Sequence, residues 1–316
     1  MVYRGAMRSA PALLKMLAVV SLAICPTAAW PADTIVCSKG LELELSTREP
    51  VQGEIVVVAV KGEPRTELRA SWSGGKLHFW GNGSDDGAQF TLLGVDLLRK
   101  PGTYPLTVDA RLSSGESVGC STDLSVRDGG FPVQRLTIDN RYVELSPEDL
   151  ARSRRETNQL LKIFRATTSA PLWDGGFQLP LENAKASGSF GKRRILNDQP
   201  RSPHSGEDFS VPAGTPVRSP QGGRVALASD LFFTGNTVVV DHGLGLYTFY
   251  AHLQTMAVEA GAMVAVGELL GRVGSTGRVT GPHLHWAARL NYTRVDPLDL
   301  VSIPPTTGPP TQETLQ

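Results

Sequence analysis

Apolar residues along this chain recur mostly at every second position, in short runs separated by turn residues. Between residues 35 and 138, the segments Leu41–Leu45 and Val118–Val126 alternate in this way, and Ile55–Val60 is a continuous apolar run. Period-2 alternation is typical of strands with one buried face, and short strands at such spacing favour a β-sandwich. We therefore predict an Ig-like β-sandwich accessory domain at residues 33–139.

A helical pattern interrupts the strands. Ser146 can cap a helix, Pro147 suits its first turn, and the two acidic residues that follow suit the positive end of the helix dipole. One apolar stripe then contains Leu150, Thr157, Leu161 and Phe164. We expect a helix over residues 147–167, within a linking segment at 140–170, and we expect it to pack between two domains.

The rest of the chain is rich in glycine and in strand patterns, so a mostly β fold with a C-terminal antiparallel sheet domain is predicted at residues 171–303. A weak repeat relates Ala213–Val225 to Ala260–Val273, as in the duplicated hybrid motif of biotin and lipoyl carriers. No lysine follows Lys192, which excludes a covalent carrier. The Pro-rich residues 304–316 are predicted to be a disordered tail.

The N-terminus has the pattern of a secretory signal peptide. Three basic residues precede the apolar stretch Met16–Cys25, and small residues follow up to Ala29. We predict a signal peptide at residues 1–29 and export to the periplasm or beyond; a retained N-terminal anchor is the alternative. No later segment approaches ~18 consecutive apolar residues, so no membrane span is expected after cleavage.

The charge balance argues against one class of function, and the cysteine content predicts a disulfide. The chain has 31 basic and 31 acidic residues, and this balance argues against a uniformly basic nucleic-acid binder. Once Cys25 leaves with the signal peptide, Cys37 and Cys120 remain. An even pair in an exported protein predicts a disulfide near the two ends of the accessory domain, with two buried free thiols as the alternative.

Candidate chemistry is concentrated in the histidines, five of which lie between positions 204 and 285. In the segment His204–Asp208, Gly206 would let the backbone bend so that the first and last side chains converge. His283 and His285 lie two apart in a predicted strand, so both imidazoles project to one face. Imidazole and carboxylate are common zinc ligands.

Each of the other polar residues in this region is interpreted either as part of the site or as a structural or surface residue. His252 ends a strand-like run and would be a further imidazole that is not a ligand. Glu207 is interpreted as peripheral, because the His-Glu-x-x-His motif that would make it a base is missing, and His242 is interpreted as structural. Arg193 and Arg194 would bind either a substrate carboxylate or an oxyanion, or else lie on the surface.

Residues 180–300, taken in order, resemble the lysostaphin-like (LytM-type) zinc metallo-endopeptidases, which hydrolyse peptidoglycan. The matching segments are Ser189-Phe190-Gly191, His204-x-Gly206-x-Asp208, Gly235-Asn236, Tyr250-Ala251-His252-Leu253 and Gly277-x-x-x-Gly281-Pro282-His283-Leu284-His285. The resemblance implies that His204, Asp208 and His285 hold one zinc ion. It also implies that His252 and His283 are the catalytic pair, on a small β-domain with a groove across its sheet.

The implied function is hydrolysis of peptide bonds in peptidoglycan stems or cross-bridges by a zinc-activated water, assisted by the two histidines. A non-catalytic regulator of other cell-wall hydrolases on the same fold is one alternative, and a secreted protease acting on proteins is another. The presence of all five residues favours an enzyme. Which histidine is the base and which bond is cut both stay open. The accessory domain is expected either to dock on the cell wall or to occlude the groove; if it occludes the groove, a chain starting near Leu172 should be more active.

Overall fold

The computed structural model describes residues 33–81 and 87–304, and these form a mostly β, antiparallel fold, as predicted. The predicted signal peptide and the predicted tail beyond Pro304 lie outside the described residues. Within the described part of the chain, no helix has both the length and the apolar composition needed to cross a membrane.

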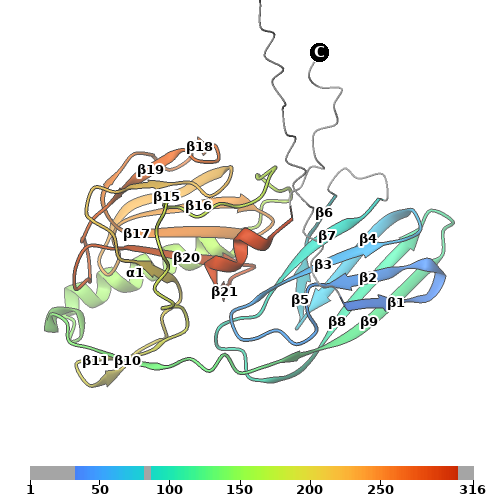
Figure 1. Cartoon of the computed structure of the whole chain (residues 1–316), viewed down its shortest axis with the longest axis horizontal. Coiled ribbons are helices and arrows are strands. Elements are labelled where there is room, and N and C mark those ends of the chain that lie inside the picture. The colour runs from blue at the N-terminus through green and yellow to red at the C-terminus, as the bar shows by residue number, and fades with distance from the viewer. Residues whose placement is uncertain (1–32, 82–86, 305–316) are drawn as a thin grey trace, which may run out of the picture. The chain divides into compact units, whose positions relative to one another are not determined.

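The first part of the chain forms two antiparallel sheets (Figure 1). One sheet has the order β1 (Asp33–Val36), β2 (Glu42–Leu45), β3 (Ile55–Lys61), β7 (Gln89–Gly94) and β6 (Phe79–Gly81). The other has the order β5 (Gly75–Leu77), β4 (Arg65–Trp72), β8 (Gly102–Leu112) and β9 (Ser117–Val126). Both sheets contribute to one apolar core, because every second residue of β2, β8 and β9 points inward.

The predicted disulfide between Cys37 and Cys120 is present, with Cα atoms 5.7 Å apart. Cys120 lies on β9 and is buried in the core, while Cys37 follows β1. The bond therefore joins the first strand of one sheet to the last strand of the other. The two-sheet arrangement agrees with a sandwich, whereas its kinship with Ig domains stays a prediction.

Segments on both sides of the helix then meet in a small sheet. β10 (Val133–Leu136) pairs in parallel with β11 (Arg193–Leu196), which turns back into β12 (Gln199–Pro200). The chain between β10 and β11 contains α1 (Pro147–Arg165), with Ser146 accepting a hydrogen bond from the Asp149 amide as N-cap. This parallel pairing brings the segment that leaves the sandwich next to the segment that leads to His204.

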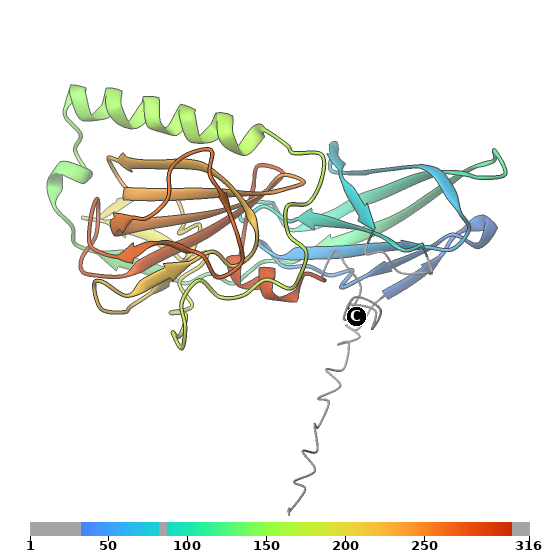
Figure 2. The ribbon, with the colours of Figure 1, turned by 90° about the horizontal axis from the view of Figure 1, so that it is seen from above.

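Helix α1 packs on the C-terminal sheet, not between two domains as expected (Figure 2). Its Phe164 is buried against Leu227 and Tyr247, and Leu160 and Ile163 pack beside it. The predicted stripe was also shifted, because Leu150 and Thr157 are exposed whereas Ser153 is buried. The Ser153 hydroxyl donates to the Leu150 carbonyl, so a polar residue can occupy the packed face without an unmet hydrogen bond.

The C-terminal sheet has nine strands. Its main order is β13 (Glu207–Phe209), β20 (Leu284–Leu290), β17 (Leu246–Met256), β16 (Gly235–Gly243), β15 (Gly223–Leu231) and β18 (Met263–Val264). The shorter strands are β14 (Pro216–Arg218), β19 (Leu269–Val273) and β21 (Thr293–Val295). The two copies of the weak repeat pair with each other, β14 with β19 and β15 with β18. The duplicated pattern in the sequence thus corresponds to two interlocked strand pairs.

The sandwich contacts the end of the C-terminal sheet through a few directed bonds. Asp96, just beyond β7, accepts hydrogen bonds from the backbone and guanidinium of Arg294 on β21. Asp299, in the short 3-10 helix Pro297–Ser302, accepts from the Ile55 amide at 2.9 Å. Burial opposes the charged form of Asp96, but its bonds with Arg294 lower the pKa of this carboxyl.

Candidate functional site

Strand register brings the candidate residues together on one face of the C-terminal sheet. Asp208 on β13 lies directly opposite His285 on β20, and His285 lies opposite Ala251 on β17. His285 and Ala287 share one face because strand residues alternate, and Ala287 belongs to the cluster that packs under α1. The helix therefore covers one part of this face, and the polar cluster occupies another.

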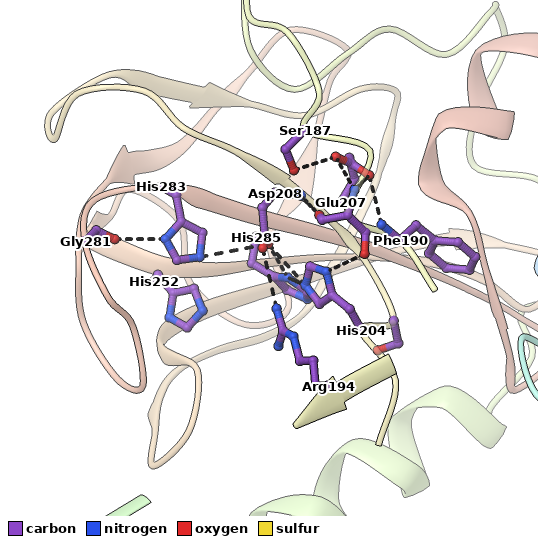
Figure 3. Close-up of polar contacts among 12 residues, drawn as sticks. Ser187, Phe190, Arg194, His204, Glu207, Asp208, His252, Gly281, His283 and His285 are labelled. Carbon is purple, nitrogen blue, oxygen red and sulfur yellow. Dashed lines mark hydrogen bonds and ion pairs between the residues drawn. The ribbon is translucent and has the colours of Figure 1, made fainter. Parts of the chain in front are cut away.

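Three side-chain atoms of the types that bind metal ions converge at the centre of this cluster, and we call them the donor atoms (Figure 3). His204 Nε2 lies 2.8 Å from His285 Nδ1 and 3.2 Å from Asp208 Oδ1. The remaining distance, between His285 Nδ1 and Asp208 Oδ1, is 2.9 Å. Among the described residues, His204, Asp208 and His285 are the group of histidine and acidic side chains with the geometry to hold a metal ion.

A loop upstream orients the first of these imidazoles. The Nδ1 atom of His204 lies 3.0 Å from the Ser189 carbonyl oxygen, so Nδ1 carries the proton and Nε2 carries the lone pair. His204 is almost fully buried. The Ser189 hydroxyl oxygen also accepts a hydrogen bond from the Asp208 amide, at 2.9 Å. One residue thus positions two members of the cluster.

Glu207 does not contact the metal-donor atoms, as expected from the sequence, but it anchors this loop, a role that was not predicted. Its buried carboxylate accepts hydrogen bonds from the amides of Ser189 and Phe190 and from the Ser187 hydroxyl (Figure 3). The side chain therefore points away from the donor atoms and holds the segment that orients His204. Because the backbone is extended at positions 207 and 208, the two neighbouring acidic side chains point to opposite faces of the strand. Glu207 can therefore hold the loop while Asp208 joins the cluster of histidines.

Gly206 is needed for close packing, and its φ is not in the positive, left-handed region. A Cβ atom at this position would lie 2.6 Å from the Trp286 carbonyl oxygen and 2.7 Å from His285 Cε1. The absence of a side chain lets the segment of His204 and Asp208 lie directly against β20.

Two further imidazoles lie beside the donor cluster. The rings of His252 and His283 have centroids 4.8 Å apart, and His283 Nε2 lies 3.9 Å from Asp208 Oδ1. His252 Nδ1 lies 2.8 Å from the Thr276 carbonyl oxygen, and His283 Nδ1 lies 2.9 Å from that of Gly281. Each ring thus gives its Nδ1 proton to a carbonyl, which leaves Nε2 as a proton acceptor.

Burial and hydrogen bonding set the charge states of His252, His285 and Asp208. Burial lowers the pKa of His252 to about 3, with the neighbouring His285 and His283 adding to the effect, and it lowers the pKa of His285 to about 4. Burial also opposes ionisation of Asp208, but hydrogen bonds with His204 and His285 outweigh it and hold the pKa of Asp208 well below its usual value. At neutral pH, His252 and His285 are therefore neutral and Asp208 is a carboxylate.

Of the remaining residues that the sequence singled out, one lies in the core, one on the surface and one in the cleft. His242 is fully buried, with Nδ1 2.7 Å from the Gly222 carbonyl oxygen and Nε2 2.7 Å from the Thr248 hydroxyl, in keeping with its structural interpretation. Arg193 is exposed and donates to the Phe131 carbonyl. Arg194, in contrast, lies 3.5 Å from Asp208 Oδ2 and lines the cleft.

The cluster opens into a cleft of about 560 Å³. His204, Asp208, His252, His283 and His285 all line it. So do Gln134, Leu136 and Ile138 from β10 and its continuation, together with Arg278, none of which the sequence argument had singled out. The β10 residues reach the cleft only because β10 pairs in parallel with β11, which the sequence did not indicate. Arg278, in contrast, lies within the Gly277–Gly281 motif segment, and this position could have marked it as a residue of the site.

Comparison with known proteins identifies the family. Residues 202–297 match the model of peptidase family M23. A crystal structure of a Pseudomonas aeruginosa protein assigned to peptidase M23 superposes with a TM-score of 0.61 and 33% identity, covering 80% of this chain and 95% of that one. The chain belongs to peptidase family M23.

Curated relatives with functional names match over a shorter region. The DD-carboxypeptidase/endopeptidase Mpg of Neisseria meningitidis is 40% identical over 127 residues, which are 40% of this chain and 29% of the relative. The peptidoglycan DD-endopeptidase ShyA of Vibrio cholerae is 42% identical over 103 residues, which are 32% of this chain and 24% of the relative. The chain thus spans less than a third of the length of either relative.

Proposed function

We propose that this protein is an exported zinc metallo-endopeptidase that hydrolyses peptide bonds in peptidoglycan stems or cross-bridges. The observation that carries the proposal is the convergence of five side chains in one cleft: His204, Asp208 and His285 as donors, and His252 and His283 beside them. Membership of peptidase family M23 and the names of the peptidoglycan DD-endopeptidase relatives support the same reading.

The donor set suits zinc. Two imidazole nitrogens and one carboxylate oxygen, all within 3.2 Å of one another, match the ligand types and the separations expected around an ion bound at about 2.0–2.2 Å. Hydrogen bonding of His204 Nδ1 to a carbonyl is the outer contact that fixes a ligating imidazole. Zinc bound here would lower the pKa of the attacking water and polarise the scissile carbonyl.

The two remaining histidines move the protons. With Nδ1 bonded to a backbone carbonyl, each ring presents an unprotonated Nε2 to the cleft. The pair accepts a proton from the attacking water and returns it to the leaving amine as the peptide bond breaks. Burial lowers the pKa of His252 and keeps this ring neutral at rest, which is the state a general base requires.

The test is digestion of purified peptidoglycan by residues 30–316, with and without a chelator, followed by mass analysis of the released fragments. We expect metal-dependent release of fragments that carry newly cleaved peptides. Zinc content is measured on the same preparation. If zinc is bound and no peptidoglycan is cut, a regulator of other hydrolases becomes the better function; if release is insensitive to the chelator, the zinc assignment is wrong.

A further inference from the structure

The cleft has a basic wall that the proposed reaction does not use. Lys192, Arg194 and Arg278 all line it, next to the cluster of histidines. Arg194 is held by Asp208. Arg201 donates to the Val143 carbonyl and to the Gln199 side chain. Two of these arginines are therefore already engaged by groups of the protein itself.

Arg278 is different, because no acidic side chain among the described residues pairs with it. Across residues 33–81 and 87–304, no carboxylate oxygen lies within ion-pair distance of its guanidinium, which instead lies 4.7 Å from the centroid of the Phe233 ring. Burial, together with the positive charges of Arg194 and Arg201, lowers the pKa of Arg278 to about 10. The side chain stays charged at neutral pH, half-buried and facing other cations, which is costly unless an anion binds there.

The backbone that carries Arg278 is locked in place. The Arg278 amide donates to the Phe233 carbonyl at 2.8 Å, and the Tyr142 hydroxyl donates to the Gly277 carbonyl at 3.0 Å. Gly277 has a φ of +76° and lies so close to Gly235 that a Cβ atom would approach its amide nitrogen to 2.4 Å. A rigid base of this kind reduces the entropy lost when a side chain binds a ligand.

A peptidase cleft receives peptides, and the anion that a peptide carries is a carboxylate. A guanidinium binds a carboxylate through two parallel hydrogen bonds. Arg278 stands three positions before Gly281, whose carbonyl orients His283, so a carboxylate held there lies close to the reacting bond. Leu136, Ile138 and Leu196 line another part of the cleft and offer apolar contacts.

We propose that Arg278 forms a carboxylate-binding subsite, so that the protein prefers peptides with a free carboxylate near the scissile bond. The inference rests on the proposed peptidase function and deepens it, because it separates stem peptides that carry carboxylates from uncharged glycine bridges. The carboxylate comes from one of two sources: the α-carboxyl of the residue that leaves, or an acidic side chain.

The experiment compares kcat/KM for four synthetic peptides. The first is a stem peptide ending in D-Ala-D-Ala with a free terminal carboxylate, and the second is its C-terminal amide. The third is the amide with an added acidic side chain next to the scissile bond, and the fourth is pentaglycine amide. The enzyme variants are the wild type, Arg278→Gln, Arg278→Lys and the control Arg272→Gln. Arg272 is an exposed arginine that bonds the Gly214 carbonyl.

We expect the wild type to favour a carboxylate peptide over its neutral counterpart by about tenfold or more, as hydrogen bonds to charged groups imply. The peptide that shows the preference identifies the source of the carboxylate. The ratio should fall toward one in Arg278→Gln, persist in part in Arg278→Lys and stay unchanged in Arg272→Gln. Zinc content and the unfolding midpoint show whether each variant is folded.

Two results would overturn the proposed subsite, and only the second would also overturn the proposed peptidase function. Cleavage of all four peptides at similar rates by the wild type refutes the subsite and leaves the peptidase function standing. A zinc-loaded wild type that cuts no peptide and no peptidoglycan removes both. If Arg278→Gln folds poorly, the preference of the wild type and its partial retention in Arg278→Lys still decide the matter.

Discussion

The Nδ1 atom of His252 lies 2.8 Å from the carbonyl oxygen of Thr276, so the ring has one defined tautomer. His252 has a φ of +63°, a conformation that is costly for a residue with a side chain. Its amide also donates to the Thr234 carbonyl at 2.8 Å, and these two bonds hold the strained residue in place. The His252 ring is thereby held with its centroid 4.8 Å from that of His283 and 6.1 Å from that of His285.

Replacing His252 by alanine should separate chemistry from metal binding. His252→Ala removes a proton acceptor but no donor atom of the cluster, so we expect zinc content to stay near one per chain. Turnover on peptidoglycan should fall by about 10²–10⁴-fold, the usual contribution of a positioned acid–base group. Near-normal turnover would remove His252 from the mechanism. His78→Ala, a histidine change in the sandwich, is the control and should alter neither quantity.

Replacing His285 by alanine should remove metal and activity together. His285 Nδ1 contacts both His204 Nε2 and Asp208 Oδ1, so His285→Ala deletes one of three donors. We expect zinc per chain, measured by atomic absorption after dialysis, to drop to background. A variant that keeps stoichiometric zinc would show that His285 is not a ligand.

Changing Glu207 to glutamine should destabilise the loop that orients His204. The carboxylate accepts from two amides and one hydroxyl, and a glutamine would turn an NH₂ group toward at least one of these donors. We expect Glu207→Gln to lose about 1–3 kcal/mol of unfolding free energy, measured by urea titration. Glu182→Gln, at a side chain that is 80% exposed, should cost almost nothing. An equal loss in both variants would argue against the anchoring role.

Adding one methyl group at Gly206 should push the His204–Asp208 segment away from β20. Its Cβ atom would meet the Trp286 carbonyl and the His285 ring, so Gly206→Ala should cost about 1–3 kcal/mol and weaken zinc binding. Metal affinity, followed by chelator competition, is the measurement. Gly176→Ala has open space around it and serves as the control. Unchanged zinc affinity in Gly206→Ala would mean that the contact yields easily.

Asp299 should make stability depend on pH. Burial, with nearby Asp296 and Glu54 adding to it, raises the pKa of Asp299 to about 7. Because the folded state holds this proton more tightly than the unfolded chain, whose aspartate titrates near 4, the contribution of Asp299 to stability falls as pH rises from about 4 to about 7.

Asp299→Asn mimics the protonated form and can still accept from the Ile55 amide. The urea midpoint of Asp299→Asn relative to the wild type should therefore rise between pH 5 and pH 8. Asp198→Asn, at a side chain that is 95% exposed, should show no such trend. A flat difference for Asp299→Asn across this range would contradict the raised pKa.

The structure also changes how regulation by the accessory domain has to be tested. Among the described residues of β1 to β9, none lines the cleft, whereas Gln134 and Leu136 of β10 do. A chain starting near Leu172 would lose β10 and α1 along with the sandwich. Its activity would therefore report damage to the cleft wall as well as loss of the sandwich, so whether the sandwich inhibits the enzyme stays a hypothesis.

The sequence by itself determined the local parts of this protein. Alternation predicted the strands, the cap at Ser146 predicted the start of α1, and an even cysteine pair predicted the Cys37–Cys120 bond, because each signal depends on near neighbours or on compartment chemistry. Motif order also identified the family and grouped the residues that converge in the cleft.

Only the tertiary structure decided what surrounds that cluster. The packed face of α1, the anchoring by Glu207 and the close approach at Gly206 all depend on contacts with strands distant in sequence. The same holds for the wall from β10 and for the isolation of Arg278 from any carboxylate of the described chain. Hydrogen-bond partners and counter-ions across such distances leave no periodic signal in the sequence, because they depend on how separate segments pack.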